Sequence, residues 1–113
     1  PVGGDQFGAL SEAISEAGVD AKMIGVDKDW TVANPEYKDL ILTSIMKLLG
    51  ASVYDYIKAD AVDKTEFSGE AYIGTLSNGG VGVTSTEFIS ESLQTKLDEL
   101  KAGIIDGSID PRS

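Results

Sequence analysis

Two ionisable side chains, Asp27 and Lys47, each stand at the end of an apolar run of this 113-residue chain. In open α/β sheets, ligands bind beyond the carboxyl ends of the strands. A carboxylate accepts hydrogen bonds from a vicinal diol, and an ammonium donates to a hydroxyl or ring oxygen. If the two runs form neighbouring strands, Asp27 and Lys47 can bind a sugar from two sides. The alternative is an exposed ion pair, which contributes little to stability.

Trp30 and an early glycine turn are further candidates for the same site. Trp30 is the only tryptophan of the chain, and it could stack on a ligand ring, cover the site or pack in the core. Gly3 and Gly4 precede a helical pattern in "VGGDQFG", as glycines do in a phosphate cradle. Asp5 at the helix start would repel an anion, so a neutral ligand suits this turn better. A tight turn without a ligand is the alternative.

Composition excludes several classes of function. Nineteen Asp and Glu face nine Lys and Arg, and this acidic balance disfavours nucleic acid and anionic membrane surfaces as partners. Because the chain has no Cys and no His, thiol nucleophiles, Ser-His triads and the usual zinc sites are excluded. No pair of carboxylates is marked out as a general acid and base. The sequence therefore marks out no catalytic residues, metal or cofactor, and we expect that the protein is not an enzyme.

The elements that would position these residues alternate between helices and strands. Apolar residues at helical spacing predict a helix over 7–17 that ends at Gly18. Buried strands are expected at 22–26 and 39–46, joined by a polar connection that Asn34-Pro35 interrupts. This order of strands and helices indicates an α/β fold with a mostly parallel sheet and flanking helices.

The second half of the chain continues this pattern less regularly. A helix follows the second strand, with Leu49, Val53 and Ile57 on one face, and a linker covers 62–70. Two further strands, 71–76 and 81–84, flank the turn "SNGG". The last helix is expected from Glu91 to Ile105, with Ser90 as N-cap and Gly107 just after its end.

Four segments, in this order, carry a resemblance to a known family: "IGVDKDW", "PEYKDLILTSIMK", "YIGTLSNGGVGV" and "LQTKLDELKAGIIDGSI". Together they resemble the C-terminal part of the basic membrane protein family, the PnrA-like substrate-binding lipoproteins of bacterial ABC transporters. The resemblance covers essentially the whole chain. It implies the type I periplasmic-binding-protein fold, in which two α/β lobes linked by crossover strands close on a ligand.

The resemblance also implies roles for single residues. In the family, the first aspartate of "GVDxD" and the lysine of "LTSxxK" bind the ribose of a purine nucleoside, and these correspond to Asp27 and Lys47. The family's glycine turn lies against the ligand, which makes Gly3 or Gly4 a further ligand-binding candidate. Two features depart from the family: "LLGAS" follows the lysine, and Trp30 stands where many members have a smaller polar residue.

By the same resemblance, residues 1–113 are the C-terminal portion of a two-lobe protein. Residues 1–46 would supply strands and a helix of the C-terminal lobe, and residues 47–113 the crossover helix, strands and final helix. Most of the N-terminal lobe, the signal peptide and the lipid anchor would then lie outside this chain. The implied location is extracytoplasmic, with the full-length protein anchored to the cell membrane.

The implied function is nucleoside binding for an ABC importer, with the permease subunits as partners. A ligand sensor or a surface antigen on the same fold is the alternative. With the other lobe outside this chain, the stripe of Leu49, Val53 and Ile57 would face water. A second copy of the chain would cover it in a homodimer, unless these elements fold back onto the sheet.

Overall fold

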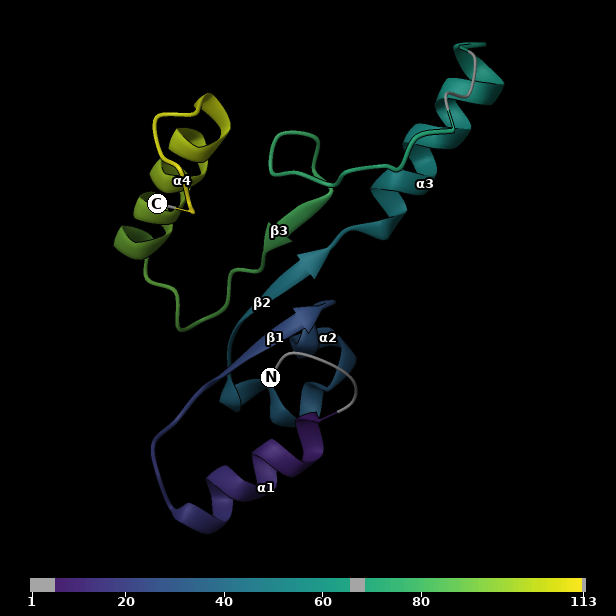
Figure 1. Ribbon diagram of the computed structural model, residues 1–113. Helices are drawn as coiled ribbons and strands as arrows, with labels where there is room; N and C mark the ends of the chain where they lie inside the picture. The colour runs from purple at the N-terminus through teal and green to yellow at the C-terminus, as the bar shows by residue number, and fades with distance from the viewer. Residues whose placement is uncertain (1–5, 66–68, 113) are drawn as a thin grey trace.

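The computed structural model describes residues 6–65 and 69–112, which form a mixed α/β structure around a three-stranded sheet (Figure 1). The strand order is β1-β2-β3. β1 pairs with β2 in parallel, and β2 pairs with β3 antiparallel. The strands are β1 (Met23–Asp27), β2 (Ile41–Lys47) and β3 (Val81–Val83).

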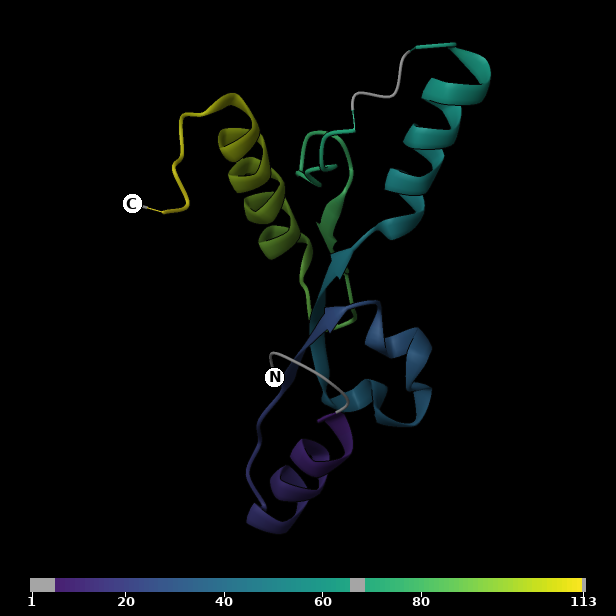
Figure 2. The same cartoon turned by 45° about the vertical axis from the view of Figure 1, so that its right-hand side comes forward.

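The prediction of a mostly parallel sheet therefore holds for β1 and β2 only. After β2 the chain runs into α3 (Leu49–Ile57), which continues away from the sheet and does not fold back over it (Figures 1 and 2). The returning chain consequently enters β3 in the opposite direction. The prediction of a strand at 71–76 is wrong, because residues 71–75 belong to no helix or strand. A turn is present at residues 76–79, one residue before the predicted position 77–80.

Asn78 organises that turn. Its side-chain oxygen accepts from the backbone N–H groups of Thr75 and Gly80, at 2.8 and 3.0 Å, and its amide nitrogen donates to the Ile73 carbonyl. Gly74 and Gly80 lie so close that a Cβ on Gly80 would be 2.3 Å from the Gly74 Cα. The Gly80 carbonyl in turn accepts from the Leu48 N–H, which ties the turn to the end of β2.

The N-terminal helix α1 (Phe7–Ala17) confirms the predicted helix, and Gly18 ends it in the left-handed conformation with φ 61°. The polar connection after β1 contains two short helices that apolar spacing does not reveal, α2 (Trp30–Ala33) and the 3-10 helix η1 (Pro35–Leu40). Proline at the start of η1 has no N–H to leave unsatisfied there.

The buried core lies where α1, β1, α2, η1 and the first part of β2 meet. Its fully buried apolar side chains are Phe7, Met23, Trp30 and Ile41. The Phe7 and Trp30 rings meet edge to face at a centroid distance of 4.5 Å. Partly buried neighbours complete it, namely Leu10, Ile14, Val26, Tyr37 and Leu40.

The helices α3 and α4 lie away from this core, on either side of the upper part of the structure (Figure 2). α3 continues into the π-helix η2 (Lys58–Val62). α4 (Glu91–Asp106) begins and ends as predicted: the Ser90 hydroxyl accepts from the Leu93 N–H, and Gly107 has φ 82°. Within the described residues, no helix is long and apolar enough to cross a bilayer.

This arrangement is extended, and it leaves apolar side chains uncovered. The radius of gyration is 17.4 Å, against about 13 Å for a compact domain of this size. Leu49, Val53 and Ile57 of α3 are 70, 56 and 60% exposed. The expectation that this stripe faces water is confirmed; the second copy that would cover it stays a prediction.

We expect the 113-residue chain to self-associate through the exposed stripe of α3. Sedimentation equilibrium across a dilution series should show a species heavier than the monomer at tens of micromolar. Val53→Asp should shift the equilibrium toward monomer, because it places a charge inside the apolar contact. Lys64→Asp, a charge change outside the stripe, serves as the control. A single species of monomer mass throughout would contradict this prediction.

Gly25 lies where the sheet meets Trp30, and we expect it to tolerate no side chain. A Cβ there would lie 2.4 Å from Ser44 Oγ and 2.8 Å from Trp30 Cγ. Gly25→Ala should therefore lower the free energy of unfolding by about 1–3 kcal/mol, the range for overpacking. Gly8→Ala is the control, because a Cβ on Gly8 meets nothing within 4 Å; it should raise stability by up to about 1 kcal/mol. Urea denaturation that ranks the two variants equal would refute the packing argument.

Candidate functional site

Asp27 and Lys47 meet at the carboxyl ends of β1 and β2. The parallel register pairs Asp27 with Met46, so Lys47 is the next residue along. Lys47 Nζ lies 2.8 Å from Asp27 Oδ1. Both side chains are more than half exposed, so a ligand can reach them. The predicted adjacency of these two residues at neighbouring strand ends is confirmed.

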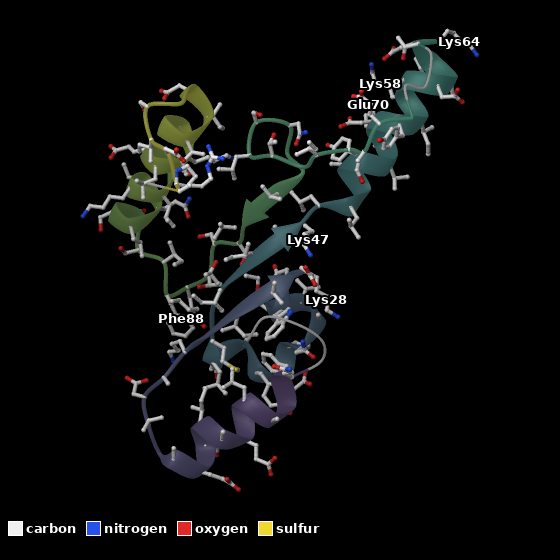
Figure 3. The ribbon with its side chains drawn as sticks, in the orientation of Figure 1. Lys28, Lys47, Lys58, Lys64, Glu70 and Phe88 are labelled. Carbon is white, nitrogen blue, oxygen red and sulfur yellow. The ribbon has the colours of Figure 1, made fainter. Side chains whose placement is uncertain are left out.

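An open hollow of about 840 Å³ surrounds this ion pair. Its floor is formed by the two strand ends, and its rim by the segment after β1 and by the first residues of α3. Lys28 and Lys47 lie at the same end of the sheet (Figure 3). The residues that line the hollow are Phe7, Val26, Asp27, Lys28, Asp29, Trp30, Asn34, Met46, Lys47, Leu48, Leu49 and Gly50.

The structure places Trp30 in the core, with one edge at the hollow. Its side chain is 4% exposed, and its ring packs against Phe7. The indole Nε1–H donates to the Val26 carbonyl at 3.0 Å, and the backbone N–H donates to Ser44 Oγ at 3.1 Å. A ring held in this way contributes part of a wall, and its faces are occupied by the protein. Packing, one of the alternatives weighed from the sequence, describes the observed position of Trp30.

The second carboxylate of "IGVDKDW" has a different task from the first. Asp29 Oδ1 accepts from the N–H and the hydroxyl of Thr31, at 2.9 and 2.7 Å. Asp29 is thus the N-cap of α2. The first carboxylate, Asp27, pairs with Lys47 instead.

Gly3 and Gly4 lie outside the described residues. Asn34, Met46 and Phe7 line the hollow but were not predicted as site residues. Asn34 stands in the Asn-Pro break of a polar connection, and Phe7 in a helical apolar pattern. Both patterns indicate local structure, and neither carries a signal for the hollow.

The charged groups that line the hollow suit a neutral polar ligand. Two carboxylates, Asp27 and Asp29, and two ammonium groups, Lys28 and Lys47, line it, so its local charges balance. These groups offer both acceptors and donors to hydroxyls. Among the described residues there is no cluster of three or more Asp, Glu, His or Cys side chains that could hold a metal ion.

Comparison with known proteins adds no relative: no family model matches the chain, and no curated protein matches it.

The backbone conformation of Asp27 predicts how stable two variants at this position are relative to each other. Asp27 has φ 70°, a left-handed conformation that costs a residue with a Cβ about 1–2 kcal/mol. Asp27→Gly removes this cost together with an exposed ion pair that is itself worth about 0–1 kcal/mol. Its stability should therefore equal or exceed that of the wild type. Asp27→Val loses the same pair but keeps a branched Cβ, so it should be less stable than Asp27→Gly by about 1–2 kcal/mol. Equal urea midpoints for the two variants would refute the strain argument.

Proposed function

We propose that this chain is part of a solute-binding protein in which Asp27 and Lys47 bind the ribose of a nucleoside. The observation that carries the proposal is the exposed Asp27–Lys47 pair, 2.8 Å apart, inside an open hollow at the carboxyl ends of two parallel strands. This edge is where open α/β sheets bind ligands. The hollow, about 840 Å³, falls within the usual range for small-molecule sites.

The pair matches the chemistry of a ribose. The two Asp27 oxygens can accept from the vicinal 2′- and 3′-hydroxyls, and the Lys47 ammonium can donate to a hydroxyl oxygen. Because the two charges neutralise each other, no net charge has to be matched by the ligand. A neutral nucleoside fits this balanced arrangement, because it brings no charge that needs a counter-charge in the hollow.

The resemblance to the basic membrane protein family extends the proposal. It assigns the chain to the C-terminal part of a type I periplasmic-binding-protein fold, with a purine nucleoside as ligand and ABC permease subunits as partners. Two observations support a second lobe: the hollow is open on one side, and the apolar stripe of α3 is exposed. In such a protein the second lobe would cover the ligand and bury this stripe.

Calorimetry with a purine nucleoside tests the proposal in a chain that contains both proposed lobes. Asp27→Ala should weaken binding by about 1–3 kcal/mol, the range for losing a charged hydrogen-bond partner. Lys47→Met should also weaken it, and a 2′-deoxynucleoside should bind the wild type less well than the ribonucleoside. Asp20→Ala, which removes an exposed carboxylate outside the hollow, should leave the affinity unchanged. Unchanged affinity in Asp27→Ala would exclude the assignment.

A further inference from the structure

The backbone at Asp27 reverses in a single residue. Among the described residues other than glycine, only Asp27 and Lys64 have positive φ. The Lys28 N–H donates to the Val26 carbonyl at 2.9 Å, which closes a three-residue γ-turn around Asp27. With positive φ at its centre, such a turn is rare and strained. Strain of this kind persists only where neighbouring structure enforces it.

The turn changes where the Asp27 carboxylate lies. In a regular strand, side chains alternate between the two faces, and paired residues share a face. An extended Asp27 would therefore project with Gly25 and with its partner Met46, on the face opposite to Lys47. The left-handed conformation takes Asp27 out of this alternation, and its carboxylate reaches Lys47 Nζ.

Trp30 supplies the contact that holds the turn. The carbonyl of Val26 accepts twice, from Lys28 N–H and from Trp30 Nε1–H. The second bond comes from a rigid ring, so it fixes the orientation of the peptide group that precedes Asp27. A turn closed only by the short-range Lys28 bond would have no such external support.

The indole is itself fixed from three directions. Phe7 packs edge to face against the indole ring, and Ser44 Oγ accepts from the backbone N–H of Trp30. Gly25 leaves room for it, since a Cβ there would lie 2.8 Å from the ring. Ser44 is fully buried on β2 and pairs in register with Gly25. The position of the indole is thus set by the core and by both parallel strands.

We propose that Trp30 is a positioning residue, whose indole N–H holds the Asp27 turn so that the carboxylate faces Lys47. Ser44 assists by fixing the Trp30 backbone. In this view the tryptophan has no contact with the ligand through its faces; it orders the carboxylate before the ligand arrives. Pre-ordering of a binding group raises affinity by lowering the entropy lost on binding. The consequence for ligand affinity rests on the proposed function, whereas the consequence for the Asp27–Lys47 geometry does not.

Because the chain has one tryptophan, biosynthetic replacement can alter this single hydrogen bond. In 3-benzothienylalanine, sulfur replaces the indole N–H while the ring keeps its shape, so packing against Phe7 is preserved. In 5-fluorotryptophan the N–H remains, and this is the matched control. Tyr37→Leu disturbs the same aromatic cluster and leaves the indole N–H that donates to the Val26 carbonyl in place, so it controls for a general loss of core packing.

The first measurement is NMR of the protein without ligand. The wild type should show a strong NOE within Asp27 between N–H and Hα, as left-handed residues do, and an NOE between Asp27 Hβ and Lys47 Hε. Both should weaken or vanish with benzothienylalanine and remain with fluorotryptophan and in Tyr37→Leu. Retention of both NOEs with benzothienylalanine, or equal loss in Tyr37→Leu, would overturn the positioning role.

The second measurement is nucleoside affinity in a chain that contains both proposed lobes, with the same two analogues inserted at position 30 alone and with Tyr37→Leu as before. Benzothienylalanine should weaken binding several-fold, in the same direction as Asp27→Ala and by less, because the carboxylate is still present. If the NOEs change as expected and the wild type binds no nucleoside, the positioning role stands and the proposed function falls. If the wild type binds nucleoside and the benzothienylalanine protein keeps both its NOEs and its affinity, the proposed function stands and the positioning role falls.

Discussion

The parallel pairing of β1 with β2 determines both the core and the candidate site. Its register sets Gly25 opposite Ser44 and Asp27 opposite Met46. The first of these pairs makes the space in which Trp30 packs, and the second brings the end of β1 beside Lys47, where the turn at Asp27 completes the ion pair. A shift of one residue would turn every side chain of a strand to the other face. The core and the ion pair would then be lost together, so a change of register cannot affect one without the other.

Local signals in the sequence were sufficient to predict the longer helices and the two parallel strands. Apolar spacing and end residues located α1 and α4 to within about a residue, because caps and helical stripes act within one turn of the chain. The meeting of Asp27 and Lys47 was also predictable. The alternation of strands and helices indicated parallel neighbours, and the carboxyl ends of parallel strands share one edge. This reasoning needed only the two strand ends and no knowledge of the core.

Other features depend on contacts that no local pattern records. α2 has four residues and η1 has six, which is too short for an apolar period to emerge. The direction of β3 depends on where α3 points. Because α3 runs away from the sheet, the chain returns and enters β3 antiparallel to β2 (Figures 1 and 2). Trp30 and Asp27 illustrate the limit most directly. Their roles follow from two hydrogen bonds of Trp30, one to the Val26 carbonyl four residues earlier and one to Ser44 Oγ 14 residues later. Composition does not reveal these bonds, so a place in the core and a place in the site stayed open alternatives for the tryptophan.

The burial of the only tryptophan also has a spectroscopic consequence. Trp30 lies in the core beside Phe7, and the other described side chains of this core come from α1, β1, η1 and β2, with none from α3 or α4. Its fluorescence therefore reports on one body of the molecule. Circular dichroism, in contrast, sums over all helices, including the 16 residues of α4. If the core and the outlying helices melt separately, the two optical signals will follow different denaturation curves. Binding of a partner along α3 would then shift the circular dichroism curve and leave the fluorescence curve where it was.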